Sequence, residues 1–146
     1  MANRFVTSIY CDDIRMEVGN KHSYIGVYYG AMFVPQMPIV LPKLCVSVSV
    51  MTPVQRPFKK LLIRLLKGDN TLGQYDVDEK ILINQANFRA PKLDETGDQL
   101  IVFGTSFVFA PFEIDKETML RIRVQTEDEE LKGPGLSIEV TPTQLT

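Results

Sequence analysis

The side chains that could carry out catalysis are few in this sequence of 146 residues. His22 is the single histidine and lies beside Gly19-Asn20, a pair typical of a turn. One loop histidine cannot build a histidine-rich metal site, and it leaves any nucleophile triad dependent on one loop residue. The sequence also lacks a phosphate-binding loop, a dinucleotide fingerprint and a G-x-S-x-G motif. We therefore expect no enzyme activity, no catalytic residue and no cofactor.

Acidic side chains gather in three places and raise the alternative of a calcium site. Calcium takes six to eight oxygen ligands, which in a β-protein must converge from more than one loop. Acidic runs are more often solvated turns, so a calcium-dependent ligand-binding module remains an alternative only. The candidates are Asp76, Asp78, Glu79, Asp94, Glu95, Asp98, Glu127, Asp128, Glu129 and Glu130.

The composition is that of an ordinary globular domain, with 45% hydrophobic and 23% charged residues. The net charge of −2 argues against a nucleic-acid binder, which would carry a basic stripe on a basic domain. No apolar run approaches the roughly 20 residues of a membrane span. We see no signal peptide at the start of the chain, and we expect a single domain over residues 1–146 in the cytoplasm of a bacterial cell.

The dominant hydrophobic period is two, which predicts strands. Apolar and polar residues alternate in several runs, and one run is apolar on both faces, as in a strand at the centre of a core. Glycine-rich turn signals separate the runs, among them Gly68-Asp69-Asn70, the turn at 95–98 and Gly133-Pro134-Gly135. The runs lie at 24–29, 44–50, 100–109, 120–125 and 136–140.

Residues 57–67 fit two structures. Phe58, Leu61, Leu62 and Leu65 recur at helical spacing, and Gly68 would end such a helix. The same residues also alternate as a strand, with Leu61, Ile63 and Leu65 on one face. The surrounding β-pattern favours the strand.

The N-terminal segment predicts a hairpin closed by Gly19-Asn20 as a two-residue loop. Under that pairing Arg15 faces Tyr24, Asp13 faces Gly26, and Cys11 faces Tyr28. Asp13, Arg15, Tyr24 and Tyr28 then form one face, a mixture of charge and aromatic rings that is typical of protein interfaces. The alternative is that these pairs only stabilise the hairpin.

The same pairing turns Asp12 toward the core, together with Tyr10, Ile14, Val27 and Tyr29. A buried carboxylate must be bonded, so Asp12 is a candidate structural polar residue. Its donors would be backbone amides at a bulge, a hydroxyl of Tyr10 or Tyr29, or Arg4.

Both cysteines, Cys11 and Cys45, face outward in this pattern, and the sequence does not show whether their strands are neighbours. Two cysteines in a chain of this size fit free thiols better than a disulfide framework.

Prolines at positions 35, 38 and 42 interrupt an apolar stretch over residues 32–42. This density stops strand pairing and predicts an extended crossover between two sheets. The apolar side chains, including Met37 and Ile39, must be covered by the domain itself or by a partner.

The chain resembles a family of small bacterial and bacteriophage β-sandwich proteins without an assigned function. The resemblance rests on a first segment and on two later strands. The first segment comprises Cys11-Asp12-Asp13-Ile14-Arg15, Glu17, Gly19, Lys21 and Ile25-Gly26-Val27-Tyr28, followed by Pro38 and Pro42. The two later strands are Leu120-Arg121-Ile122-Arg123-Val124 and Gly135-Leu136-Ser137-Ile138. It implies a sandwich of immunoglobulin-like or C2-like shape and a phage or prophage gene, and it brings no catalytic residues.

Together these features predict an all-β, single-domain antiparallel β-sandwich with about eight strands. We expect a non-enzymatic domain that binds a bacterial host or phage protein, as an accessory protein of a phage. A virion structural component is the alternative within binding, and the chain could also form a homo-oligomer.

Overall fold

The computed structural model describes residues 3–90, 92, 97 and 99–142. Eleven strands and two short helical segments occur in these residues. The strands are β1 (Phe5–Glu17), β2 (Lys21–Tyr28), β3 (Ala31–Val34), β4 (Ile39–Leu41), β5 (Leu44–Pro53), β6 (Leu61–Lys67), β7 (Asn70–Asp76), β8 (Leu100–Phe109), β9 (Phe112–Ile114), β10 (Thr118–Thr126) and β11 (Glu130–Val140). The helical segments are α1 (Glu79–Ile83) and the 3₁₀ turn η1 (Gln85–Phe88).

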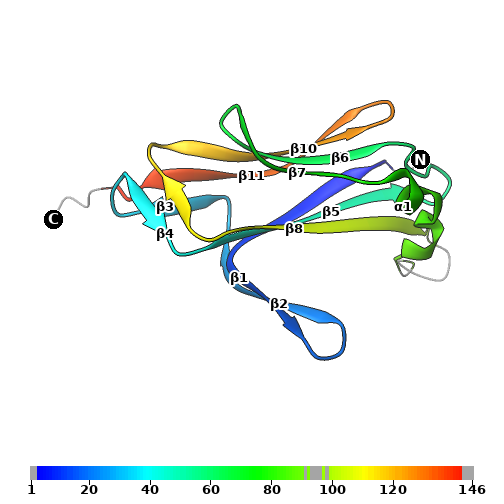
Figure 1. Ribbon diagram of the computed structural model, residues 1–146, viewed down its shortest axis with the longest axis horizontal. Coiled ribbons are helices and arrows are strands. Elements are labelled where there is room, and N and C mark those ends of the chain that lie inside the picture. The colour runs from blue at the N-terminus through cyan, green and yellow to red at the C-terminus, as the bar shows by residue number, and fades with distance from the viewer. Residues whose placement is uncertain (1–2, 91, 93–96, 98, 143–146) are drawn as a thin grey trace.

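Two sheets pack face to face, which confirms the all-β sandwich (Figure 1). One sheet has the strand order β2-β1-β5-β8 and the other β3-β11-β10-β6-β7. Strands β4 and β9 form a small third sheet at one end. The expected count of about eight was too low, because β3, β4 and β9 are only three or four residues long. The sheets are also not wholly antiparallel, since β3 pairs with β11 in parallel.

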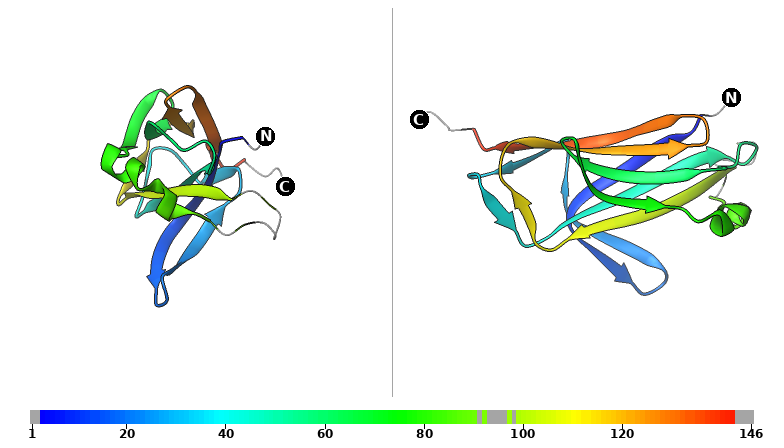
Figure 2. Two further views of the ribbon diagram at one scale, coloured as in Figure 1. Left: turned by 90° about the vertical axis from the view of Figure 1, so that its right-hand side faces the viewer. Right: turned by 45° about the horizontal axis from the view of Figure 1, so that its top comes forward.

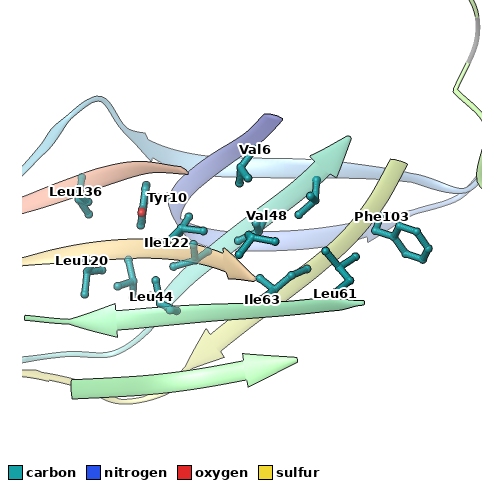
Figure 3. Close-up of a cluster of buried hydrophobic side chains, with 14 of the residues drawn as sticks. Val6, Tyr10, Leu44, Val48, Leu61, Ile63, Phe103, Leu120, Ile122 and Leu136 are labelled. Carbon is teal, nitrogen blue, oxygen red and sulfur yellow. The ribbon is translucent and has the colours of Figure 1, made fainter. Parts of the chain in front are cut away.

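The core lies between the two sheets and is built by the predicted alternation (Figure 3). Inward side chains of β5, β6 and β10 are completely buried, while their neighbours in sequence point outward. Burial of this apolar surface is the main force that holds the two sheets together. The fully buried side chains on these three strands include Val46, Val48, Val50, Leu61, Ile63, Leu65, Leu120, Ile122 and Val124.

The strand interpretation of residues 57–67 is confirmed for Leu61–Lys67, which pairs with both β10 and β7. Leu61, Ile63 and Leu65 are its buried face. By contrast, β8 is not a strand at the centre of the core with both faces buried, as its apolar sequence suggested. It is the last strand of the four-stranded sheet, and Val108 on its outer face is 55% exposed.

The proline-rich stretch leads from β3 in one sheet to β5 in the other, which confirms the crossover. The expected loss of strand pairing is wrong at its two ends, because β3 pairs with β11 before Pro35 and β4 pairs with β9 after Pro38. Met37 and Ile39 are half-buried and pack against the core, so the domain itself covers these two candidate interaction residues. The predicted turn at Gly133-Pro134-Gly135 is instead an irregularity within β11, opposite Leu120 and Ile122. The predicted turn at 95–98 lies mostly outside the described residues.

Arg4 holds the N-terminal end of β1 to three other parts of the sandwich. Its side chain is only 1% exposed and forms an ion pair with Glu127. Nε donates to the Thr52 hydroxyl at 3.0 Å, and Nη2 donates to the carbonyls of Arg56 and Pro57 at 3.2 and 3.0 Å. A guanidinium group with this many acceptors is a satisfied buried cation, so Arg4 is a structural residue.

Candidate interaction site at the projecting hairpin

The first hairpin extends beyond the sandwich as a free arm (Figures 1 and 2). Only the first half of β1, Phe5 to Cys11, pairs with β5. The second half pairs with β2 alone, so that both edges of the hairpin are open there. We call residues 12–28 the arm. An isolated two-stranded hairpin is marginally stable in water, so the sandwich end of this arm must hold it in place.

The arm is paired one residue away from the predicted register. Glu17 lies opposite Lys21, which leaves a three-residue loop of Val18, Gly19 and Asn20. The turn signal itself was correct, because Gly19 and Asn20 both have a positive φ, of 92° and 57°. Three-residue hairpin loops, like two-residue ones, need a residue with a positive φ, so the Gly-Asn signal suits both loop lengths.

The shifted register separates the residues that were expected to form one face. Arg15 pairs with Ser23 instead of Tyr24, and Asp13 pairs with Ile25 instead of Gly26. Tyr24 lies opposite Ile14, and its hydroxyl is 3.4 Å from that of Ser47. A single charged and aromatic face made of Asp13, Arg15, Tyr24 and Tyr28 is therefore wrong. The register change explains the error, since one residue of slip moves side chains to the other face.

Asp12 is exposed and not directed into the core, but its carboxylate is bonded as expected. The donor is the Tyr28 hydroxyl, 2.5 Å from Oδ1, and not Tyr10, Tyr29 or Arg4. Burial and this hydrogen bond raise the pKa of Tyr28 above its ordinary range. Gly26 lies beside Asp12, because its neighbours Ile25 and Val27 pair with Asp13 and Cys11. Its φ is 69°, and a Cβ at this position would clash with the Asp12 carboxylate. The pairing continues through this point without the predicted bulge.

A small hollow lies at the base of the arm. Its volume is about 300 Å³, and it brings two arm residues together with the end of the proline-rich crossover. The lining residues are Asp12, Tyr28, Leu41, Pro42 and Lys43. A carboxylate, a phenol ring and two apolar side chains around one hollow can receive a side chain that combines an apolar stem with a polar end.

Asp13 forms an ion pair with Lys43 next to this hollow, with Oδ1 2.6 Å from Nζ. The hydrogen bond from Lys43 holds the pKa of Asp13 below its ordinary value, and the same contact raises the pKa of Lys43. Lys43 was not among the residues singled out in the sequence. Nothing in its local pattern marks it, because its partner lies 30 positions earlier in the chain.

The two cysteines lie directly opposite each other on β1 and β5, and both are fully buried. The expectation that they face solvent was wrong. Cys11 pairs with Val27 on its other side and Cys45 with Val108, so an apolar row crosses all four strands. Both thiols are free. Burial raises the pKa of Cys11, and the neighbouring Cys45 adds to this effect.

The end of the arm exposes apolar side chains to solvent. Met16 is 79% exposed and Val18 is 95% exposed, and Ile25 lower on the arm is 43% exposed. His22 packs edge-on against Tyr24, with ring centroids 6.4 Å apart. Large apolar residues at the end of a projecting element have no partner within the described part of the domain, and such exposure is typical of interaction sites.

Several of the acidic groups considered for calcium have other contacts. Glu127 binds Arg4 and accepts from the backbone N–H of Lys59 at 2.6 Å, and Asp128 accepts from Arg56 at 3.0 Å. Asp78 caps α1 by accepting from the backbone N–H of Lys80. Asp94, Glu95 and Asp98 lie outside the described residues. Among the residues that are described, no three acidic, histidine or cysteine groups are placed to hold a metal ion.

The fold and the arm define a β-sandwich with a projecting hairpin and a small polar hollow at its base. The chain belongs to a family of unknown function, DUF6941, whose model matches residues 6–139. No curated protein matches the chain. Within the described residues, no helix is long and apolar enough to cross a membrane.

Proposed function

We propose that this chain is a non-enzymatic protein-binding domain that contacts its partner through the arm. The carrying observation is the exposure of Met16 and Val18 at the end of a hairpin whose two edges are both open. Burying such side chains against a partner is favourable by about 25 cal/mol for each Å² of apolar surface. An open strand edge can add main-chain hydrogen bonds to a partner strand.

The hollow at the base of the arm supports the same proposal. Small pockets beside projecting apolar residues are where interface anchors bind, because a side chain enclosed there loses its contact with water. Asp12 offers a carboxylate to such an anchor, while Leu41 and Pro42 offer apolar contact. Lys43 also lines the hollow, but its charge is balanced by the ion pair with Asp13. A long side chain with a hydrogen-bond-donating or basic end fits this combination.

We further propose that the domain acts in the bacterial cytoplasm as an accessory protein of a phage or prophage. The resemblance to small bacterial and bacteriophage proteins supports this setting. The partner is then a host protein or another protein of the phage.

The test is capture of partners from bacterial lysate with matched variants. The arm variant combines Met16→Ser and Val18→Ser, and the control variant combines Ile83→Ser and Met119→Ser. The control residues are 80% and 42% exposed, and they lie on α1 and on β10 of the other sheet, outside the arm and the hollow at its base. Captured proteins are identified by mass spectrometry, and thermal melts confirm that both variants fold.

A protein that is captured by the natural chain and by the control, but lost with the arm variant, is the expected result. A photo-reactive residue at position 18 should crosslink to the same protein, and one at position 83 should not. Capture that is equal with both variants would refute binding through the arm.

A further inference from the structure

Three cationic side chains form one row across the outer face of the five-stranded sheet. Lys132 on β11 lies opposite Arg123 on β10, and Arg123 lies opposite Arg64 on β6. Their neighbours in sequence Val124 and Ile63 are completely buried, so these three side chains point away from the core. We call Lys132, Arg123 and Arg64 the cationic row. Figure 1 shows this sheet on the side of the sandwich away from the arm.

The charges of this row are only partly balanced within the described residues. Like charges directly opposite each other on neighbouring strands are unfavourable. Glu130 pairs with Arg64 at 3.4 Å, and this is the single ion pair that the described residues make with the row. Arg123 donates to the backbone carbonyl of Ile122 at 2.9 Å.

Arg64 also has an unused donor. Its Nε is buried and has no hydrogen-bond partner among the described atoms. A guanidinium group presents its N–H donors in a fixed planar fork that matches a carboxylate. The row therefore has an excess of positive charge at the surface, and this charge points to an anionic ligand. Arg64 must turn its side chain outward for Nε to reach an acceptor of that ligand.

We propose that the cationic row binds an acidic segment of a protein partner. Carboxylates of that segment would pair with Arg64, Arg123 and Lys132, and the guanidinium fork of Arg123 permits bidentate pairing. Leu62 and Leu66 flank Arg64 on the same face of β6 and are half-buried. They offer apolar contact to side chains that stand between the carboxylates.

A nucleic acid fits this surface less well. Non-specific binding of single strands relies on aromatic rings that stack with bases, and the row contains none. Asp76 and Glu130 lie in the adjoining row of the same face, aligned through Leu62 and Gln125. These carboxylates would repel a continuous phosphate backbone, whereas a peptide can place a neutral or basic residue there.

This proposal goes beyond binding through the arm, because the arm extends the other sheet. If both surfaces are used, the domain joins two partners or two parts of one. The two proposals fail separately, since the variants that test them share no residue.

The experiment measures binding of a fluorescent synthetic peptide of repeated Glu-Glu-Leu to the full chain by anisotropy, at about 150 mM salt, where long-range attraction is screened. A Gln-Gln-Leu peptide and a single-stranded oligonucleotide are the comparison probes. The row variant combines Arg123→Gln with Lys132→Gln. The matched control combines Lys80→Gln with Lys116→Gln and changes the net charge by the same amount elsewhere on the surface.

We expect saturable binding of the acidic peptide, weakened at least about tenfold in the row variant and unchanged in the control. Arg123→Lys, which keeps the charge but loses the fork, should weaken binding by a smaller factor. Thermal melts that match the natural chain confirm that the row variant folds. Equal weakening in both double variants, no saturable binding, or tighter binding of the oligonucleotide through the row would each overturn the proposal.

Discussion

The Tyr28 hydroxyl donates a hydrogen bond to Oδ1 of Asp12 at 2.5 Å, and so joins the two strands of the arm where they leave the sandwich. Tyr28 also packs against the core, whereas Asp12 is exposed. The pair therefore links the arm to the body of the domain. Its loss should loosen the arm more than it destabilises the sandwich.

The first prediction measures this pair with a double-mutant cycle. Tyr28→Phe and Asp12→Asn should each lower the free energy of unfolding, and the coupling between them should be about 0.5–1.5 kcal/mol, the usual worth of one hydrogen bond. Chemical denaturation of the two single variants and the double variant gives the value. Tyr24→Phe combined with Asp12→Asn is the control and should be additive. Additivity in the Tyr28 cycle as well would contradict the bond.

The Asp12→Asn variant should also change the ionisation of Tyr28. Asp12 contributes to the raised pKa of Tyr28 through its hydrogen bond and its charge, after burial. Asp12→Asn removes the charge, so the pKa of Tyr28 should fall toward its ordinary value. Ultraviolet difference titration of the tyrosines, compared with Tyr28→Phe, identifies the signal. An unchanged titration would mean that Asp12 does not act on this phenol.

The second prediction concerns Gly26, whose positive φ and position beside Asp12 leave no room for a side chain. Gly26→Ala should destabilise the protein by about 1–3 kcal/mol, because it adds backbone strain and displaces the Asp12 carboxylate. Gly19→Ala is the matched control, since Gly19 also has a positive φ but has open space around it. Thermal or urea unfolding should show the larger loss at Gly26. Equal losses would show that the contact with Asp12 contributes nothing.

The third prediction concerns Arg4. Arg4→Met removes a buried cation and leaves Glu127 without its partner, so it should cost about 3–5 kcal/mol of folding stability. Arg56 pairs with the same acidic run, but its side chain is 43% exposed. Arg56→Met should therefore cost much less folding stability. Urea denaturation of both variants compares the two effects. Similar losses would show that Arg4 is not the central cation of this cluster.

The fourth prediction is a pH dependence of stability. Burial opposes the ionisation of Glu127, but hydrogen bonds from Arg4 and from the backbone of Lys59 hold its pKa below its ordinary value. The unfolded chain therefore takes up a proton first, near the ordinary glutamate value of about 4.3. The stabilisation is complete above that pH and is lost as the pH falls through the lower pKa of the folded state.

Denaturation curves measured from about pH 7 to pH 3 should show this loss. Asp13 and Asp128 have lowered pKa values and add to it, each through its hydrogen bond to a basic side chain. In Glu127→Gln the free energy of unfolding should fall less steeply toward low pH, but it should still fall. A fall as steep as that of the natural chain would contradict the assignment to Glu127.

The fifth prediction concerns the thiols of Cys11 and Cys45. Both side chains are fully buried, and burial raises the pKa of Cys11, so a thiol reagent should label them slowly in the folded protein. Labelling should become fast when denaturant unfolds the chain. Val18→Cys supplies an exposed thiol as the control and should react at once. Native cysteines that react as fast as this control would show that the sheet opens readily at the arm.

The strand content of this protein follows from its sequence, because alternation of apolar and polar residues places one face of each strand in a core whatever the topology. This is why β5, β6, β10 and the end of β11 were predictable. The crossover between the two sheets was predictable from the prolines of residues 32–42, but the short pairings of β3 and β4 on either side of Pro35 and Pro38 were not. The positive φ at Gly19 and Asn20 was also predictable, because glycine and asparagine are the residues that tolerate this backbone conformation.

Other features were decided only by the tertiary structure. The register of the arm was not predictable, since loops of two and three residues share one turn signal. The partners Asp13 and Lys43, the opposed cysteines and the Arg4 cluster come from strands far apart in the sequence, and no local pattern records which strands become neighbours. The same reason explains the cationic row. Each cation is an ordinary outward residue of its own strand, and only the pairing of β11, β10 and β6 places Lys132, Arg123 and Arg64 side by side.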